Sequence, residues 1–518
     1  MRQPESIAKA FDDLRQDFRA AKQTRFSSKP RGVNPMGSGA DWHYSRERDY
    51  LWMIERARAF QRDDMVVGQG VRRLVSNVVR GGFTPDPKTG DPDLDRAQIE
   101  MHDEWAADKD QCHSEGEYTF EQMERAVLRH AITDGDIWSL LRNDNKIQFA
   151  EAHRPRTPKT KRNVVHGVLL DSNSRREEVW IAKESQSPRE RVSRVSDLKQ
   201  YKIRDENGDR QVLQVYFPQR FSQRRGVTAF APITDCVGMH DDLQFNTMVK
   251  AQMSSLMVII REQTKDPNSG SAGPALGSSS ANNRESENVG GDDAEWGSIP
   301  RIKTGLDVRL PYGEKATGFT PNIPNPEFFP HTSLLLTFIA VNLDMPVQML
   351  LLDPTKTNFS GWRGAIEQAR IRFVEIQSDL VAQFHRPMWK WRVRNMMRQS
   401  PAIRKMASRS GVNAFRHDWQ FPGWPYIDKL KDAQADDLAI TRFLDSPRRV
   451  QAARNRKWSQ VAGEIVADKG ILIRNAIEEA DAINQQFPTA GVTWRELLGP
   501  GLTSESPVIQ TIETGAGA

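Results

Sequence analysis

Apolar residues recur at spacings of three and four along much of the chain, the pattern of helices that bury one face. Such patterns predict helices over residues 1–30, 41–80, 94–107, 120–132, 233–262, 331–343 and 429–487. Thr119 is the expected N-cap of the 120–132 helix. The clearest stripe follows Gly361, and its members are Trp362, Ile366, Ala369, Phe373, Ile376, Leu380 and Phe384. Pro387 should kink or end this long helix, because it removes a backbone donor.

Strand patterns are short and lie mostly between residues 134 and 217. The segments DGDIWSLL, KIQFAEAH, VVHGVLLDSNSRREEVWIAKE and RQVLQVYFP are rich in β-branched and aromatic residues and are separated by turn residues. Two further fragments, DVRLPYG and KATGFTP, lie just after residue 305. The sequence therefore predicts a helix-rich α+β protein with a modest sheet.

Three segments lack core-forming residues. Residues 27–39 form a turn-rich linker, and residues 263–297 are rich in Gly, Ser and Asn. The last twenty residues are expected to be a loose tail. With 518 residues, the chain is too long for one ordinary core, so two or more domains are expected.

Composition narrows the function classes. The net charge is +5, which predicts nucleic-acid contact through local basic patches rather than through a global field. The two cysteines, Cys112 and Cys236, form no C-x-x-C motif, so folding in a reducing, intracellular place is expected and a thiolate metal site is not. No signal peptide and no run of eighteen apolar residues is present, so no membrane association is expected.

The stretch MLLLDPTKTNFSGWRGAIEQARIRF, residues 349–373, contains a polar loop with one lysine before the long helix. A phosphate-binding loop needs glycines ahead of a Lys-Ser/Thr pair at a helix start. Here Gly361 follows Lys356 by five residues, so a nucleotide site is disfavoured. Thr357 and Ser360 are the candidate caps of the following helix.

Other candidate chemistry is weak. The ten histidines match no zinc spacing, including His102 and His113 beside Cys112. The acidic clusters DGD (134–136) and GGDDAE are consistent with Mg²⁺ ligands, but a turn before a strand and a solvated loop explain them equally. No catalytic residue, metal site or cofactor is predicted.

Four basic stretches are candidates for contact with a nucleic acid backbone. They are KTKR (159–162), SRRE (174–177), QRRG (223–226) and the helix end that carries Arg386, Lys390, Arg392, Arg394 and Arg398. A solvated surface is the favoured interpretation of each one taken alone. Cations near a helix C-terminus are also stabilised by the helix dipole, without any DNA.

Four segments, in order, resemble the portal proteins of lambda-type tailed bacteriophages. They are QCHSEGEYTFEQMERAVLRHAITDGDIW, RRGVTAFAPITDCVGMHDDLQFNTMVKAQMSS, MLLLDPTKTNFSGWRGAIEQARIRF and FPGWPYIDKLKDAQA. The chain departs from the family pattern at Phe359, where Tyr is commoner, and at Gly361-Trp362, which replace small residues. The resemblance covers most of residues 45–485.

The resemblance implies a portal fold with a wing, a stem, a clip and a crown that assembles as a ring. The implied parts are an N-terminal wing (1–231), stem helix 1 (232–262), a clip (263–329), stem helix 2 (330–348), a tunnel loop (349–360), a long helix with the C-terminal wing (361–428), a crown (429–500) and a flexible tail (501–518). A ring of about twelve identical copies at one capsid vertex would be closed by heterologous contacts.

The implied function is a channel for DNA packaging and ejection, without enzymatic activity. The implied partners are further copies of the chain, double-stranded DNA, the terminase large subunit, the major capsid protein and a head-tail adaptor, in a virion assembled in the cytoplasm of a bacterial host. Alternatives are a packaging enzyme subunit, either nuclease or ATPase, and a passive capsid adaptor.

The residues implied to meet DNA come from two segments. The tunnel loop would present Thr355, Lys356, Thr357, Asn358, Phe359 and Ser360 to the duplex. Gln244, Lys250 and Gln252 are candidates for lining the channel from the stem. Small hydroxyls, amides and one lysine would give weak, exchangeable phosphate contacts, as sliding DNA requires.

Overall fold

The computed structural model describes residues 47–158, 163–183, 198–221, 223–255, 259–261, 307–309, 328–353, 355, 357–424, 429–454, 456, 458–489 and 491–498. Two compact units are present: residues 1–231 with 343–518, and residues 232–342. The helices predicted within residues 1–30, the segment KATGFTP, most of the predicted clip and the C-terminal tail lie outside the described residues. No described helix is both long and apolar enough to cross a lipid bilayer.

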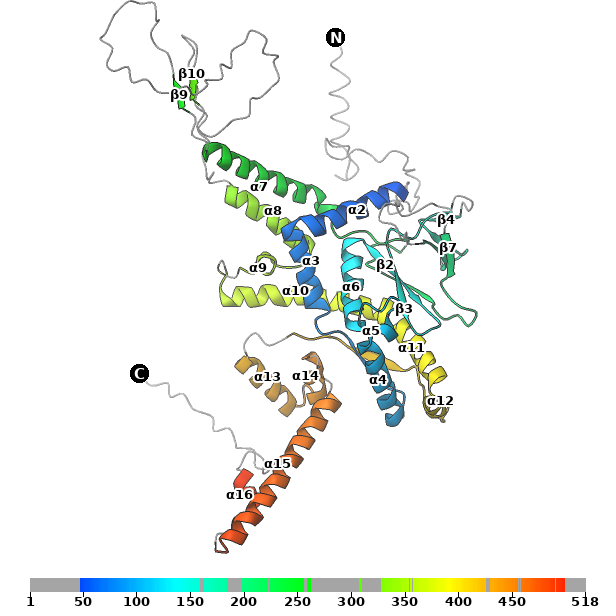
Figure 1. Ribbon diagram of the computed structural model, residues 1–518, viewed down its shortest axis with the longest axis vertical. Helices are drawn as coiled ribbons and strands as arrows, with labels where there is room; N and C mark the ends of the chain where they lie inside the picture. The colour runs from blue at the N-terminus through cyan, green and yellow to red at the C-terminus, as the bar shows by residue number, and fades with distance from the viewer. Residues whose placement is uncertain are drawn as a thin grey trace, which may run out of the picture. The chain divides into compact units, whose positions relative to one another are not determined.

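Among the described residues before β2, the first unit contains the helices α2 (Glu47–Asp63), α3 (Met65–Val78), α4 (Pro92–Ala107), α5 (Lys109–Cys112) and α6 (Phe120–Thr133) (Figure 1). Asp64 separates α2 from α3 and caps α3, accepting a hydrogen bond from the backbone N–H of Val67 at 2.6 Å. Thr119 caps α6 as predicted, in a reciprocal capping box with Gln122. Side-chain caps thus divide the predicted 41–80 helix and start α6.

Two antiparallel sheets follow these helices. One has the order β3-β2-β8, with β2 (Asp136–Leu141), β3 (Ile147–Glu151) and β8 (Val212–Tyr216). The other has the order β4-β5-β6-β7, with β4 (Val164–Val165), β5 (Val168–Leu170), β6 (Arg176–Ala182) and β7 (Leu198–Lys202). A shared cluster that includes Trp138, Val179, Ile181 and Val212 joins the two sheets. The predicted strands are confirmed, and β7 is an addition that the sequence pattern did not predict.

A small sheet was also not predicted. β1 (Thr84–Pro87) pairs antiparallel with β11 (His417–Gln420), and Pro85 and Pro87 stand opposite Trp419 and His417. Proline cannot donate to a ladder, so it is tolerated only in edge strands, and both strands of a two-stranded sheet are edges. Pro85 and Pro87 therefore made β1 resemble a turn in sequence.

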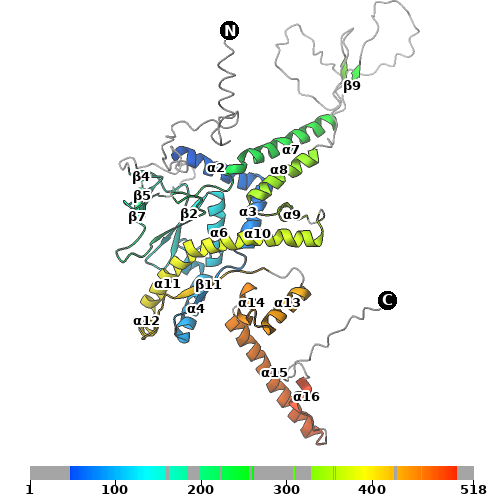
Figure 2. The same cartoon turned by 180° about the vertical axis from the view of Figure 1, so that it is seen from behind.

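The predicted long helix is confirmed, with a change at its centre. α10 (Phe359–Leu380) runs into a π-helical turn at Val381–His385 and then into α11 (Arg386–Gln399), with Pro387 in the first turn of α11 (Figure 2). Five members of the predicted stripe after Ile366 are almost fully buried: Ala369, Phe373, Ile376, Leu380 and Phe384. Within the π-helical turn, His385 lies 2.6 Å from Glu124, and both side chains are buried.

The remaining helices of the first unit are α9 (Val347–Leu351), α12 (Pro401–Ala407), α13 (Lys429–Thr441), α14 (Pro447–Ala453), α15 (Trp458–Gln486) and α16 (Trp494–Leu498). α15 packs against α14 and α16. The predicted helical region 429–487 is thus confirmed as three helices with short breaks.

The second unit contains two long helices that lie side by side, α7 (Thr234–Ser255) and α8 (Phe328–Asn342) (Figures 1 and 2). The predicted extension of the first helix to residue 262 is wrong, because Ile259–Arg261 forms strand β9, which pairs in parallel with β10 (Asp307–Arg309). The run of Val258, Ile259 and Ile260 explains the change, since β-branched residues favour strands. The predicted helix 331–343 is confirmed as α8, which ends at Asn342, and α9 begins at Val347 after Pro346.

Candidate functional site

The polar connection between α9 and α10 is fixed at both ends by local hydrogen bonds. α9 is followed by Leu352 in the left-handed region, with φ 55°. The Asp353 carboxylate accepts hydrogen bonds from the Thr355 backbone N–H at 3.0 Å and from its hydroxyl at 2.5 Å. Asn358 caps α10 by accepting from the Gly361 N–H at 2.7 Å. Local hydrogen bonds therefore hold the described residues near both ends of the connection.

The structure redistributes the predicted loop residues. Thr355, Thr357 and Asn358 lie in the connection, whereas Phe359 and Ser360 belong to the first turn of α10. Lys356 lies outside the described residues. The predicted caps, Thr357 and Ser360, are wrong: Asn358 takes this role because its side chain reaches the N–H three residues ahead.

The base of this connection is held by α3. Arg73 of α3 donates hydrogen bonds to the carbonyl oxygens of Met349, at 2.8 Å, and of Leu350. Gly70 lies so close to Leu343 that an added Cβ would lie 2.6 Å from its Cδ1. A larger residue here would force the Leu343 side chain to shift, so α3 packs closely against the segment that leads into the connection.

The three candidates on α7 do not share one side of the helix. Gln244 is half-buried, with its amide nitrogen 3.0 Å from His240 Nε2, whereas Lys250 and Gln252 are exposed. At about 100° per residue, Lys250 and Gln252 point about 160° apart. They therefore cannot both line one continuous surface of a straight α7.

α8 carries an exposed apolar stripe. Leu334, Phe338 and Val341 follow one another at spacings of four and three and are 48%, 47% and 66% exposed. Phe245 and Met248 on α7 are also exposed. Exposed apolar residues gathered on one helix face usually mark a contact surface.

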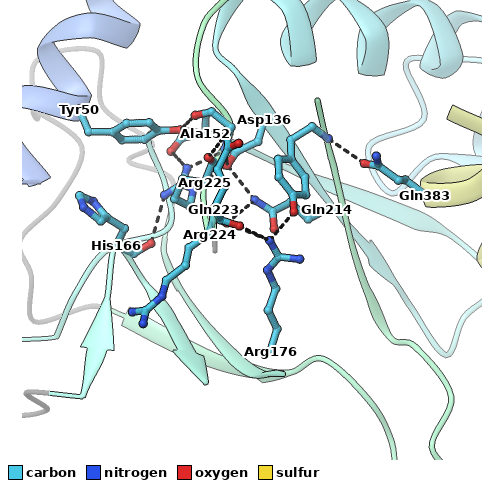
Figure 3. Close-up of polar contacts among 12 residues, drawn as sticks. Tyr50, Asp136, Ala152, His166, Arg176, Gln214, Gln223, Arg224, Arg225 and Gln383 are labelled. Atoms are coloured by element: carbon cyan, nitrogen blue, oxygen red, sulfur yellow. Dashed lines mark hydrogen bonds and ion pairs between the residues drawn. The ribbon is translucent and has the colours of Figure 1, made fainter. Parts of the chain in front are cut away.

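Two of the motifs that carry the family resemblance meet inside the first unit. Asp136, at the end of DGD, is fully buried and lies opposite Arg225 of QRRGV (Figure 3). Its carboxylate accepts from Arg225 Nε at 2.6 Å and Nη2 at 2.9 Å, from the Gly226 N–H at 3.0 Å and from Gln214 Nε2 at 2.9 Å. We call this set the Asp136 clamp.

Glycine is required where the two motifs cross. Gly135 has φ 99°, and a Cβ built on Gly226 would lie 1.8 Å from the Gly135 carbonyl oxygen. The two backbones therefore touch directly, and the clamp fixes the chain shortly before it enters α7.

Arg225 is bound on every side. It also donates to the backbone carbonyls of Ala152, at 2.5 Å, and His166, at 3.2 Å, and its guanidinium stacks on Tyr50 at 4.7 Å. Burial alone would lower its pKa, but the negative charge of Asp136 outweighs burial and raises the pKa of Arg225 above its usual value. The arginine is therefore permanently charged and neutralises Asp136.

The other carboxylate of DGD has its own partners. Asp134 accepts from Arg58 at 2.8 and 2.6 Å and lies 2.9 Å from His130 Nδ1. Burial acts to raise the pKa of Asp134, but Arg58 and His130 outweigh it and lower the pKa. Both carboxylates of DGD are thus paired with arginine, as the interpretation of DGD as a turn before a strand requires.

Asp134 gives a prediction about acid stability. Because the pKa of Asp134 is lowered in the folded protein, its ion pairs add fully to the free energy of unfolding above the ordinary carboxyl pKa of about 4. This stabilisation is lost as the pH falls through the folded-state pKa of Asp134. Asp134→Asn should lower the free energy of unfolding by about 1–3 kcal/mol at pH 7 and by progressively less towards pH 3. Thermal melts of both proteins across this pH range measure the difference, and a gap that widens in acid would contradict the assignment.

The FPGW motif joins α3 to α10. Gln377 of α10 donates to the carbonyls of Val78, at 2.8 Å, and Pro422, at 3.0 Å. The indole N–H of Trp424 donates to the carbonyl of Asn77 at 3.0 Å, and Arg370 stacks on the same ring at 5.3 Å. This motif therefore braces the helices that carry the α9–α10 connection.

Comparison with known proteins identifies the family. Residues 27–377 match the family model described as phage portal protein, lambda family. No curated protein sequence matches the chain significantly. A chain in the neck of an empty GTA particle, computed with C6 symmetry, is 11% identical, with 79% of this chain and 94% of that chain covered and a TM-score of 0.43. Since the family model spans well over half of the sequence, this chain belongs to the lambda family of phage portal proteins.

Proposed function

We propose that this portal protein meets translocating DNA through the α9–α10 connection, residues 353–358. Portal proteins are structural proteins of the virion that form a ring with a DNA channel at a capsid vertex. The predicted alternatives, a packaging enzyme and a passive adaptor, are therefore set aside. The observation that carries the proposal is the anchoring of a short polar turn by Arg73, Asp353 and Asn358.

The chemistry of this turn suits a sliding duplex. Asp353 accepts from the Thr355 N–H, and Asn358 accepts from the Gly361 N–H at the start of α10, so neither donor is free to hold a phosphate. The side chains of Thr355, Lys356 and Thr357 add hydroxyl groups and a single cation. Contacts of this kind are weak, exchangeable and independent of DNA sequence.

We assign the parts of the chain to the wing, stem, clip and crown of the portal fold. Residues 1–231 and 361–428 form the wing, α7 and α8 the stem, the segment between them the clip, and residues 429–500 the crown. The separate compact unit at residues 232–342 supports this division, because stem and clip would then form one body.

The stem would supply contacts between neighbouring copies. The exposed stripe of Leu334, Phe338 and Val341 is the surface we assign to the adjacent subunit, whose α7 exposes Phe245 and Met248. In a heterologous ring each copy presents two different faces, so an apolar face on one helix can meet its partner on the next subunit. The ring would contain about twelve copies.

The further partners follow from these assignments. The clip is proposed to dock the terminase large subunit and later the head-tail adaptor, and the wing to contact the major capsid protein. Assembly would take place in the cytoplasm of the bacterial host.

The proposal is tested by the double variant Lys356→Ala/Thr357→Ala. Rings should assemble normally, while packaged or retained DNA should fall about tenfold because phosphate contacts are lost from every copy at once. Electron microscopy of the rings and nuclease-protected DNA per particle are the measurements. Ser333→Ala on α8 is the control. Packaging at the normal level in the double variant would show that the α9–α10 connection does not contact the DNA in the channel.

A further inference from the structure

Two basic stretches that the sequence placed about fifty residues apart line one hollow in the first unit. Arg176 opens β6, and Arg224 directly precedes Arg225 of the Asp136 clamp (Figure 3). Arg175 lies just before β6. Arg204 and Arg210 join them from the turn between β7 and β8. The hollow has a volume of about 520 Å³ and also contains Trp138, Tyr216 and the fully exposed Phe221.

No acidic side chain from the described residues balances the positive charge in this hollow. Among the described residues that line it, none is acidic. The carboxylate of Asp136 in the clamp forms its ion pair with Arg225. Burial and the charges of Arg204, Arg176 and Arg175 lower the pKa of Arg210, and burial and Arg176 lower the pKa of Arg224. The arginines therefore repel one another, and an anion would relieve that repulsion.

The protein itself positions one of these arginines. Arg176 donates to the Tyr216 hydroxyl at 2.8 Å and to the carbonyls of Gln223 and Arg224, each at 3.2 Å, and its guanidinium lies 5.0 Å from the Tyr216 ring. Within the described part of the chain, the guanidinium groups of Arg175, Arg210 and Arg224 have no such hydrogen bond or ion pair. The hollow thus combines a fixed cation with three that remain available.

The basic surface continues beyond this hollow. A second hollow shares Arg204 and Arg210 with the first and adds Arg386, Lys390 and Arg394 of α11. It contains one acid, Asp209, which pairs with Arg394 at 2.5 Å. Arg386, Lys390 and Arg394 of α11 therefore line a hollow that adjoins the one lined by Arg175 and Arg224. We call the two hollows together the arginine groove.

We propose that the arginine groove binds the phosphodiester backbone of duplex DNA that lies outside the portal channel. The guanidinium fork suits phosphate oxygens, and an elongated row of cations suits a linear polyanion better than a single small ion. DNA is also the polyanion that this protein handles, so it is present at high concentration wherever the ring works. The groove would let the wing hold DNA that has already entered or has yet to enter the channel.

Closed circular DNA tests the proposal, because an intact circle cannot be threaded through a preassembled ring. Assembled rings should bind a relaxed, covalently closed plasmid with a strong dependence on salt. Arg175→Ala/Arg210→Ala/Arg224→Ala should weaken this binding about tenfold or more at low salt and lower the slope of log K against log salt by about 2–3. Gel shift and fluorescence anisotropy over a salt series give both quantities.

The matched control removes the same charge elsewhere. Arg72→Ala/Arg96→Ala/Arg129→Ala replaces three exposed helix arginines that line neither hollow. It should bind the plasmid nearly as the unaltered protein does. Equal losses in both triple variants would overturn the proposal, because only net charge would then matter. Rings that bind an oligoglutamate peptide but not the plasmid would overturn it too, and would point to an acidic protein segment.

Discussion

Asp136→Ala should destabilise the first unit by about 3–5 kcal/mol, the cost of leaving a buried charge without its partner. Arg225 is buried and enclosed by Tyr50 and backbone carbonyls, so it cannot move its charge into water. The Gly226 N–H would lose its acceptor at the same time, and the Gln214 amide would keep only the carbonyl of Arg224. We expect a drop in the melting temperature of purified protein and much less soluble protein on expression.

A double substitution separates the charge from the packing. Asp136→Leu/Arg225→Met removes both charges, and a buried ion pair replaced by apolar groups is often close to neutral. The double variant should therefore be more stable than Asp136→Ala alone, which is the sign of strong coupling. Additive losses would show that the two side chains act independently and that the clamp is not one unit.

Leu334→Asp/Phe338→Asp should prevent ring formation. The two side chains stand one helical turn apart on the exposed apolar stripe of α8, and burying two carboxylates against an apolar neighbour would weaken each subunit contact by about 100-fold or more. The individual chain should keep its fold, because neither side chain is buried within it. Mass photometry and negative-stain images should show single chains in place of rings, with an unchanged circular dichroism spectrum.

The adjacent residue provides the control. Ser333 is exposed on another face of α8, so Ser333→Asp adds a charge to the same helix without touching the stripe. Rings of Ser333→Asp should assemble normally. Normal rings of the Leu334→Asp/Phe338→Asp variant would mean that the stripe faces something other than the neighbouring copy.

Local signals in the sequence predicted local structure well. The Thr119 cap, the strands of the two larger sheets other than β7 and the buried stripe of α10 follow from spacing and residue type alone. The errors also have local causes: Asn358 competes with Thr357 as a cap, and a β-branched run turns the expected end of α7 into β9. The pair β1–β11 was missed because its stability depends on a partner more than three hundred residues away.

The polar sites depend on contacts between residues far apart in the sequence. Sequence alone therefore could not tell which charged residues are structural and which are open to a ligand. Asp136 and Arg225 are eighty-nine residues apart, and nothing in DGD or QRRG indicates that each neutralises the other. Neighbouring arginines also differ in role: Arg225 is buried in the clamp, while Arg224 beside it lines the arginine groove. On α11, Arg392 is buried against Trp105, whereas Arg394 reaches the surface. Burial, which only the fold decides, divides structural arginines from those available to a ligand.

The π-helical turn at Val381–His385 determines which face of α11 points towards the core. A regular helix of one residue fewer would rotate α11 by about 100° relative to α10. Trp389, Val393 and Met396 would then leave the core, and Gln383 would no longer accept from the Tyr216 N–H, which it now does at 2.9 Å. One additional residue in this turn thus keeps two helices in register with a sheet, and a deletion anywhere between residues 381 and 385 would disturb a much larger region than its length suggests.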